Sequence, residues 1–325
     1  MSELHRFVFD GLPVRGALVR LTDAWQEILR RRQISATGAW PQPLRALLGE
    51  MTAAGVLMQA NIKFDGALIL QIFGDGPVKL AVAEVQADLR LRATATVAGE
   101  VAPSARLSDL VNVANQGRCA ITLDPLARRP GQRPYQGVVP LFGDRHEKLE
   151  ALGAVLEHYM LQSEQVDTRL VLAADDRVAA GLLIQRMPAE GGAAAGAARP
   201  DEERIGLDED YNRIATLAAS LTRDELLTLD VDTVLRRLFW QERLQRFAPR
   251  VGADGPRFAC TCSSERVANM IRGLGQGEAT GIIAERGQIE VGCEFCGRQY
   301  RFDAIDAAQL FAAPGIASPG SSAVH

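Results

Sequence analysis

The sequence runs Cys260-Thr-Cys262, then thirty residues, then Cys293-Glu-Phe-Cys296-Gly297. This stretch decides how the C-terminal part of the chain folds, because cysteines one or two residues apart can direct both sulfurs at one ion. A glycine after the second pair suits the tight turn of a metal-binding knuckle. Four thiolates close a tetrahedral site, whereas a hydrolytic zinc keeps one position open. The spacing therefore predicts one zinc ion held by all four cysteines.

A mixed set of cysteine and histidine ligands does not fit this stretch, because no histidine lies between residues 251 and 312. Cys262 comes just before a predicted helix, whose dipole favours a thiolate there. These residues alone leave open whether the zinc is a redox switch or only structural. Basic neighbours favour reactive thiolates: Arg257, Arg266, Arg298 and Arg301.

The zinc-binding domain is predicted to extend over residues 251–312. Ser263 or Ser264 is expected to cap a helix that ends at Gly273 and Gly275. Residues 313–325 are rich in Pro, Gly and Ser and predict a disordered tail. The helix carries Val267, Met270, Ile271 and Leu274 on one face, and a hairpin is expected from Ile289, Val291, Tyr300 and Phe302.

Residues 189–250 are predicted to be a linker with metastable helices. The Ala- and Gly-rich tract 189–200 has no side chains that could build a core. Thr222 and Glu225 have the spacing of a capping box, and Asp232 is expected to cap the next helix. Such charged helices form only when their apolar stripe docks on something. That stripe comprises Val234, Leu235, Leu238 and Phe239.

Residues 1–188 predict an N-terminal core in which helices and strands mix without regular alternation. This order favours an α+β fold with a mixed α/β core domain, followed by the helical linker segment and the small zinc-binding domain. Helices are predicted over residues 22–32, 43–59 and 146–163, and strands over 67–73, 78–82, 89–97, 118–123, 136–141, 169–173 and 181–187.

Composition narrows the functional classes. The chain has 325 residues, 47% of them apolar, and a formal net charge of −4, which argues against nucleic-acid binding. No apolar run approaches a membrane span, and the first residues do not form a signal peptide, so a cytoplasmic protein is expected. Neither a phosphate-binding GxxxxGK[ST] loop nor a GxSxG motif is present, so the usual ATPase and hydrolase classes are not expected.

Longer motifs surround the cysteines: Arg257-Phe258-x-Cys260-Thr-Cys262-Ser263, Glu265-Arg266-Val267 and Gly287-x-Ile289-Glu290-Val291-x-Cys293-x-Phe295-Cys296-x-x-x-Tyr300-x-Phe302. They resemble the heat shock protein 33 family of redox-regulated bacterial chaperones. The likeness covers nearly the whole chain. Further segments in family order are Arg15-Gly16, Lys63-Phe64-Asp65-Gly66, Gly74-Asp75-Gly76-Pro77, Tyr135-Gln136-Gly137-Val138-Val139, Ser163-Glu164-Gln165, Thr168-Arg169, Met187-Pro188 and Glu225-Leu226-Leu227.

The resemblance implies an ATP-independent holdase, not an enzyme, that is inactive while reduced and zinc-bound. It implies that oxidation forms the disulfides Cys260–Cys262 and Cys293–Cys296, that zinc leaves, and that the linker unfolds to expose a surface for unfolding client proteins. It also implies a homodimer when oxidised and a downstream ATP-driven foldase that receives the clients.

Three features depart from the family pattern. They are extra residues near Ser35 to Trp40, the tract 189–200 and the additional Cys119, which is expected to be a buried small hydrophobe. Two alternative functions have different requirements. A zinc ribbon that binds nucleic acid would need a basic face, and a thiol oxidoreductase would need one cysteine pair to turn over with a dithiol reductant.

Overall fold

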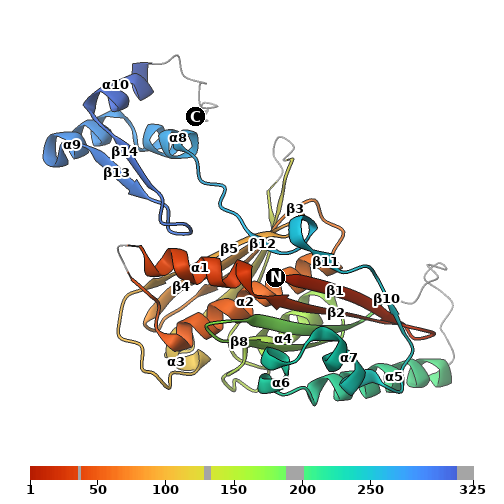
Figure 1. Ribbon diagram of the computed structural model, residues 1–325. Coiled ribbons are helices and arrows are strands. Elements are labelled where there is room, and N and C mark those ends of the chain that lie inside the picture. The colour runs from red at the N-terminus through yellow and green to blue at the C-terminus, as the bar shows by residue number, and fades with distance from the viewer. Residues whose placement is uncertain (36–37, 128–132, 188–200, 313–325) are drawn as a thin grey trace, which may run out of the picture. The chain divides into compact units, whose positions relative to one another are not determined.

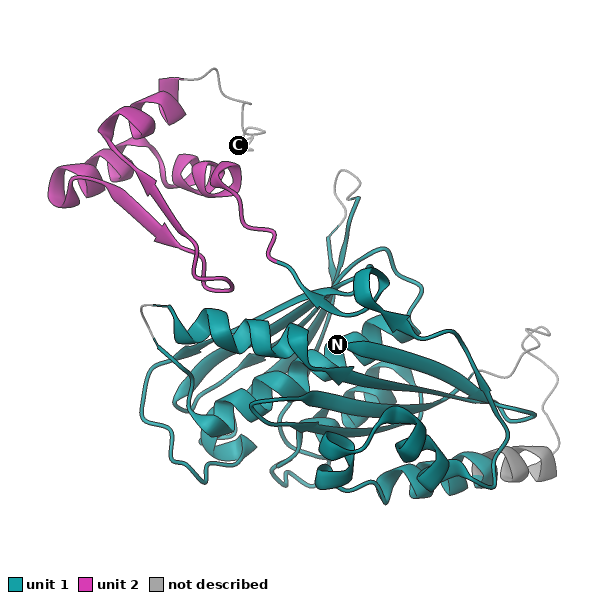
Figure 2. Cartoon of the chain, in the orientation of Figure 1, with its two compact units in different colours: residues 1–259 teal, residues 260–325 magenta. Residues whose placement is uncertain are grey.

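The computed structural model describes residues 1–35, 38–127, 133–187 and 201–312, and the side chains of all of these except 201–208. The chain divides into two compact units, residues 1–259 and residues 260–325 (Figure 2). The division lies beyond residue 251, the predicted start of the zinc-binding domain. The predicted tract 189–200 and tail 313–325 lie outside the described residues.

The first sheet of unit 1 joins the beginning of the chain to segments more than 150 residues away. Its strands lie in the order β10-β1-β2-β9-β8, and β11 also pairs with β1. All these pairs are antiparallel. The strands are β1 (Glu3–Phe9), β2 (Val14–Leu21), β8 (Thr168–Ala174), β9 (Ala179–Arg186), β10 (Leu244–Arg246) and β11 (Arg250–Val251).

The second sheet lies in the order β12-β5-β4-β3-β6-β7. Its pairs are antiparallel except for β12 with β5, which is parallel and draws residues 257–258 into unit 1. The strands are β3 (Gly66–Phe73), β4 (Val78–Gln86), β5 (Arg90–Val97), β6 (Arg118–Pro125), β7 (Tyr135–Pro140) and β12 (Arg257–Phe258).

Helix α2 (Gln42–Asn61) packs against strands of both sheets (Figure 1). Most of its residues are buried, as expected for a helix that is apolar around its whole circumference. Gly49 permits the close approach, because a Cβ there would lie 2.4 Å from the Cβ of Ala174 on β8. The other helices of this part are α1 (Asp23–Gln33), α3 (Leu107–Val111) and α4 (Leu152–Glu164).

The opposite face of the first sheet is covered by three helices, α5 (Asp201–Ala219), α6 (Arg223–Thr228) and α7 (Val231–Phe239), here called the covering segment. Their apolar side chains form a second core with that sheet. With both faces covered, β9 buries seven of its eight residues instead of alternating. The sheet residues that the covering segment packs against, here called the outer sheet face, are Phe7, Phe9, Val14, Leu18, Ala173, Ala180, Leu182 and Ile184.

Unit 2 is small and built around a two-stranded hairpin. Its described core contains only seven buried apolar residues, three of them alanines. The elements are α8 (Ser264–Leu274), α9 (Gln276–Arg286), β13 (Ile289–Gly292), β14 (Gln299–Phe302) and α10 (Ala304–Ala312). The helix α8 and the hairpin were predicted from the sequence, whereas α9 and α10 were not.

The predicted α+β fold is confirmed, but several helix and strand boundaries differ from the predicted ones. The predicted helix 146–163 begins only at Leu152, because His146 has a left-handed φ of 62° and the Leu149 N–H donates to the Leu141 carbonyl. The helix cap expected at Asp232 is Asp230, whose carboxylate accepts from the Thr233 N–H at 2.9 Å. Strands β1 and β2 were not predicted. The capping box of Thr222 and Glu225 is present.

Within the described residues, no helix combines the length and the apolarity that crossing a membrane requires.

Candidate metal centre

The structure brings the four C-terminal cysteines together. Their Sγ atoms all lie within 4.8 Å of one another. The shortest separations join Cys260 to Cys293, at 3.6 Å, and Cys262 to Cys296, at 3.4 Å. Tetrahedral zinc with bonds of about 2.3 Å places its sulfurs about 3.8 Å apart. The four sulfurs therefore have the number, chemistry and spacing that a metal ion of this kind requires.

The second cysteine pair sits on a knuckle between β13 and β14. The Gly297 N–H donates to the Cys293 carbonyl at 2.8 Å, and the Cys293 N–H donates to the Arg298 carbonyl at 2.9 Å. Gly297 has a φ of 72°, which glycine adopts without strain. These bonds close the turn and hold both sulfurs of the pair on one side.

The first pair leads directly into α8. Ser263 is the N-cap of α8, and its hydroxyl accepts from the Arg266 N–H at 3.2 Å. Cys262 therefore precedes the cap by one residue, where the partial positive charge of the helix end lies. The Tyr300 hydroxyl donates to Cys262 Sγ at 3.1 Å. Tyr300 was predicted only as a hairpin residue, and its contact with the sulfur was not predicted.

Gathering four thiols at this distance shifts their ionisation. The hydrogen bond from the Cys293 thiol lowers the pKa of Cys260 to about 4, and the same contact raises the pKa of Cys293. Burial raises the pKa of Cys296. Thiols so close cannot all lose their protons unless a cation lies among them.

Among the four arginines expected to support the thiolates, Arg298 interacts with the sulfurs. Its pKa is raised first by the Tyr300 hydroxyl and then by Cys262 and Cys296. Arg257 lies in unit 1 and donates to the Asp88 carboxylate, Arg266 donates to the Thr261 hydroxyl, and Arg301 pairs with Glu290.

Cys119 lies on β6 in the main core of unit 1 and is 1% exposed. Burial raises the pKa of its thiol to about 12, so the reactive thiolate is scarce at neutral pH. The expected role of a small hydrophobe is confirmed by its packing. It does not belong to the cysteine cluster.

The predicted stripe of α7 is buried against the outer sheet face. Val234, Leu235, Leu238 and Phe239 are all at most 3% exposed. The Phe239 ring packs edge-on against Phe9, with the ring centroids 5.0 Å apart. Phe7 lies 6.2 Å from the same ring.

Arg20 on β2 anchors the covering segment by polar contacts that the sequence analysis missed. Its Nη1 donates to the carbonyls of Leu226 and Leu229, at 2.8 and 2.6 Å, and its Nη2 donates to that of Leu227 at 3.2 Å. These carbonyls lie at the C-terminal end of α6, where a cation is favourable. No pattern in the sequence indicates a contact over some 200 residues.

Comparison with known proteins agrees with these features. A family model described as "Hsp33 protein" matches residues 2–303. The "33 kDa chaperonin" of Chromobacterium violaceum is 44% identical over 310 residues, which cover 95% of this chain and 94% of that protein. That of Methylobacillus flagellatus is 41% identical over 326 residues, which cover 100% of this chain and 99% of that protein.

A solved structure has the same fold. The 33 kDa chaperonin (heat shock protein 33 homolog) of Thermotoga maritima superimposes with a TM-score of 0.71, covering 95% of this chain and 97% of that one, at 19% identity. The family match and the sequence identities over nearly full length show more than the fold. The chain therefore belongs to the heat shock protein 33 family of chaperones, which are not enzymes.

Proposed function

We propose that this chaperone is a redox-regulated, ATP-independent holdase whose client surface is hidden by the covering segment. The observation that carries the proposal is the pairing of the outer sheet face with α7. The sheet contributes large apolar side chains such as Phe7 and Phe9, and α7 contributes a full stripe. Separating the two would expose a contiguous apolar surface, which is what an unfolding protein binds.

Zinc is the ion proposed for the cysteine cluster, with Cys260, Cys262, Cys293 and Cys296 as its ligands. The donor set supports it, because four thiolates in a tetrahedral array suit zinc and no carboxylate or histidine joins the described cluster. Bound zinc would supply about 10–16 kcal/mol of folding free energy to a small domain of this kind. Unit 2, with its seven-residue core, depends on such a staple.

Oxidation is proposed to pair Cys260 with Cys262 and Cys293 with Cys296, each pair of thiolates giving two electrons to the oxidant as its S–S bond forms. The pairing decides which parts of unit 2 remain cross-linked. Disulfides within each motif leave no cross-link between the segment before α8 and the hairpin, because the four sulfurs no longer bind one metal ion. Pairs across the motifs would keep these two parts cross-linked and would stabilise the fold. Only disulfides within the motifs therefore remove the cross-link that the metal supplies.

The proposed switch assigns one role to each part of the chain. Residues 1–188 form the client-binding and dimerising core, 189–250 the linker and 251–312 the redox switch. Loss of structure in the switch would spread to the covering segment through residues 244–258, which pair with β1 and β5. The described apolar side chains of the covering segment form one core together with the outer sheet face. Once detached, its helices should unfold.

Partners follow from the family. A chaperone of this family binds unfolding client proteins. Dimerisation of the oxidised form and transfer of clients to an ATP-driven foldase are part of the proposal, as is a cytoplasmic location, where thiols are kept reduced.

The test is aggregation of a heat-unfolding client, followed by light scattering with reduced and with oxidised protein, while zinc release is measured in parallel. Suppression by the oxidised form alone, together with loss of one zinc per chain, is the expected result. Peptide mapping of the oxidised form should find the two disulfides within the motifs. Equal suppression by the reduced form would contradict redox control.

A further inference from the structure

A mainly apolar pocket of about 200 Å³ lies in unit 1. Its lining comes from strands of both sheets and from the C-terminal ends of α2 and α4. Apolar side chains make most of the wall, among them Leu68, Ile121, Met160 and Leu183. All of the lining residues belong to unit 1, so the pocket is formed within one compact unit.

The pocket is separate from the outer sheet face. Arg15 on β2 and Leu183 on β9 line the pocket. Their neighbours in the sequence, Val14 and Leu182, belong to the outer sheet face. Because successive side chains of a strand point to opposite sides of a sheet, the pocket lies on the other side of the first sheet from the covering segment.

Arg15 is the one cation among the described residues of the lining. Its Nε donates to Gln185 Oε1 at 3.0 Å, and its Nη2 donates to the same oxygen. Gln185 is itself held, because its Nε2 donates to the Thr168 hydroxyl at 3.1 Å. The guanidinium is therefore fixed along one edge. The donors on Nη1 and the second hydrogen on Nη2 have no acceptor among the described residues.

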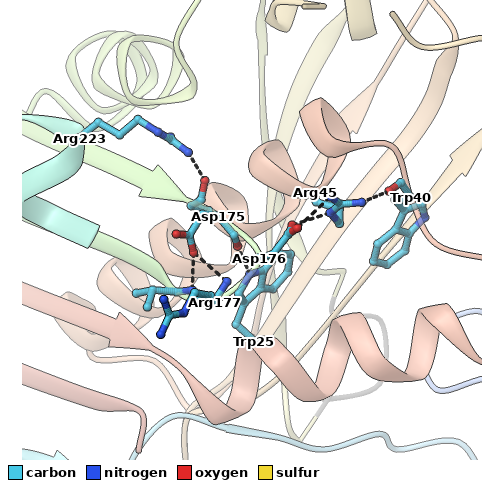
Figure 3. A network of polar contacts seen from close by, with 9 residues as sticks. Trp25, Trp40, Arg45, Asp175, Asp176, Arg177 and Arg223 are labelled. Atoms are coloured by element: carbon cyan, nitrogen blue, oxygen red, sulfur yellow. Dashed lines mark hydrogen bonds and ion pairs between the residues drawn. The ribbon is translucent and has the colours of Figure 1, made fainter. Parts of the chain in front are cut away.

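The partner of Arg15 is neutral, which is unusual for a half-buried arginine. Arg45 shows the common arrangement, because its Nε and Nη2 donate to the Asp176 carboxylate at 2.6 and 3.0 Å (Figure 3). Arg15 makes its two bonds to an amide oxygen instead. Burial lowers the pKa of Arg15, so its charge is partly withdrawn from water without a described carboxylate to offset it.

The one carboxylate in the described lining, Glu164, does not supply that charge. Its Oε1 accepts from the Tyr159 hydroxyl at 2.8 Å and from the Tyr135 hydroxyl at 3.2 Å. Two hydroxyl donors thus stabilise the negative charge of Glu164, whereas Arg15 faces the pocket with a neutral partner. The charge that lacks a counter-charge in the pocket is the positive one.

A purely structural explanation accounts for only part of this arrangement. Arg15 and Gln185 lie directly opposite each other in the pairing of β2 with β9, so their contact stabilises the sheet as a cross-strand pair. That contact uses one edge of the guanidinium. It explains neither the open apolar pocket beside the other edge nor the neutral partner.

We propose that this pocket binds a small apolar carboxylate, whose oxygens accept hydrogen bonds from Nη1 and Nη2 of Arg15. The planar guanidinium matches a carboxylate with two parallel bonds, and such charge-assisted bonds are stronger than neutral ones. The apolar part of the ligand lies against the leucine, isoleucine and methionine side chains of the wall. An apolar cavity of about 150 Å³ can hold benzene, so this pocket is large enough for one ring or a short chain.

The test uses the reduced full-length chain and three probes at neutral pH and constant ionic strength: phenylacetate, its neutral amide phenylacetamide, and acetate. The methyl resonances of Met58 and Met160, assigned with Met58→Leu and Met160→Leu, should shift and saturate with phenylacetate, because both side chains line the pocket. Met51 is fully buried outside the lining and should not shift.

The three probes separate the charge from the apolar body. Phenylacetate should bind about tenfold or more tightly than phenylacetamide, which lacks the charge, and than acetate, which lacks the ring. Equal affinity for phenylacetate and either of the other probes overturns the proposal, as does the absence of a saturating shift. This comparison is made on the unaltered chain and does not depend on the folding of a variant.

Variants then assign the charge to Arg15. Arg15→Gln should weaken phenylacetate binding about tenfold or more and change phenylacetamide binding less than about twofold, since only the charge-assisted bonds are lost. Val166→Phe places a ring in the pocket and should weaken the binding of both probes. Arg118→Gln, at an exposed position outside the lining, is the matched control. Equal weakening by Arg15→Gln and Arg118→Gln overturns the site, and thermal melting checks that each variant folds.

Discussion

Unit 1 and unit 2 are held together by different means. The main core of unit 1 contains 43 buried apolar residues among those described, and a second core of 19 joins the first sheet to the covering segment. The described core of unit 2 contains seven. Met270 and Leu274, two of the four residues expected on the buried face of α8, are about half exposed. Unit 1 can fold on apolar burial, whereas unit 2 needs a cross-link at its cysteines.

The covering segment is intermediate between unit 1 and unit 2 in how far its order depends on other parts of the chain. The apolar side chains that it contributes to the second core are as well buried as those of the main core, but that core is shared with the outer sheet face. Such a segment is ordered only while it is docked. Burial of its side chains alone does not show that an element can fold independently. Independent folding requires that the apolar residues against which those side chains pack belong to the same element.

The largest effect is expected from removing metal ligands. Cys260→Ser combined with Cys293→Ser should abolish zinc binding and unfold unit 2, since about 10–16 kcal/mol of binding free energy is lost. Elemental analysis should find no zinc, and hydrogen exchange should become fast over residues 260–312 but not in α2. Cys119→Ala is the control and should retain zinc. Full zinc retention in the double variant would show that these cysteines do not hold the ion.

A smaller but still large effect is expected from Leu238→Glu. A charge in this buried stripe should cost about 3–5 kcal/mol and detach the covering segment without touching a ligand. The reduced variant should keep its zinc and suppress client aggregation without oxidant. Arg236→Glu, at an exposed position of the same helix, is the matched control. If Leu238→Glu detaches the segment and stays inactive, the disulfides themselves must shape the client site.

A matched pair of truncations compares the two units directly. Ile72 and Ile271 are both fully buried, so either change to alanine should cost about 2–5 kcal/mol. Ile72→Ala should lower the melting temperature of unit 1 and leave zinc in place. Ile271→Ala should speed the loss of zinc to a chelator. Equal rates of zinc loss in both variants would show that the small core does not support the metal site.

The smallest effect is expected at Arg20. Arg20→Ala removes three hydrogen bonds to the end of α6 and should cost about 1–3 kcal/mol. Exchange should become faster in α6, while the core strands keep their protection. Arg243→Ala, which removes an exposed arginine without such contacts among the described residues, is the control. No change in α6 would mean that apolar burial alone holds the covering segment.

Local sequence determined much of this protein. The cysteine spacing was sufficient to predict a four-sulfur cluster, because a metal knuckle is formed by residues a few positions apart. Helices α1, α2 and α8 and most strands of the second sheet were predicted near their observed bounds, since periodic apolar residues report which face is buried. The α7 stripe was identified for the same reason. Family motifs then gave the resemblance that the comparisons confirm.

Only the tertiary structure decided where these parts dock. Strands β1 and β2 pair with β9, β10 and β11, so their stability comes from residues far along the chain. For the same reason residues 251–259 belong to unit 1, although they precede the first cysteine closely. Arg20 likewise joins segments distant in sequence. Periodicity reports that a face is buried, but the partner that buries it is set by long-range packing, which no local pattern encodes.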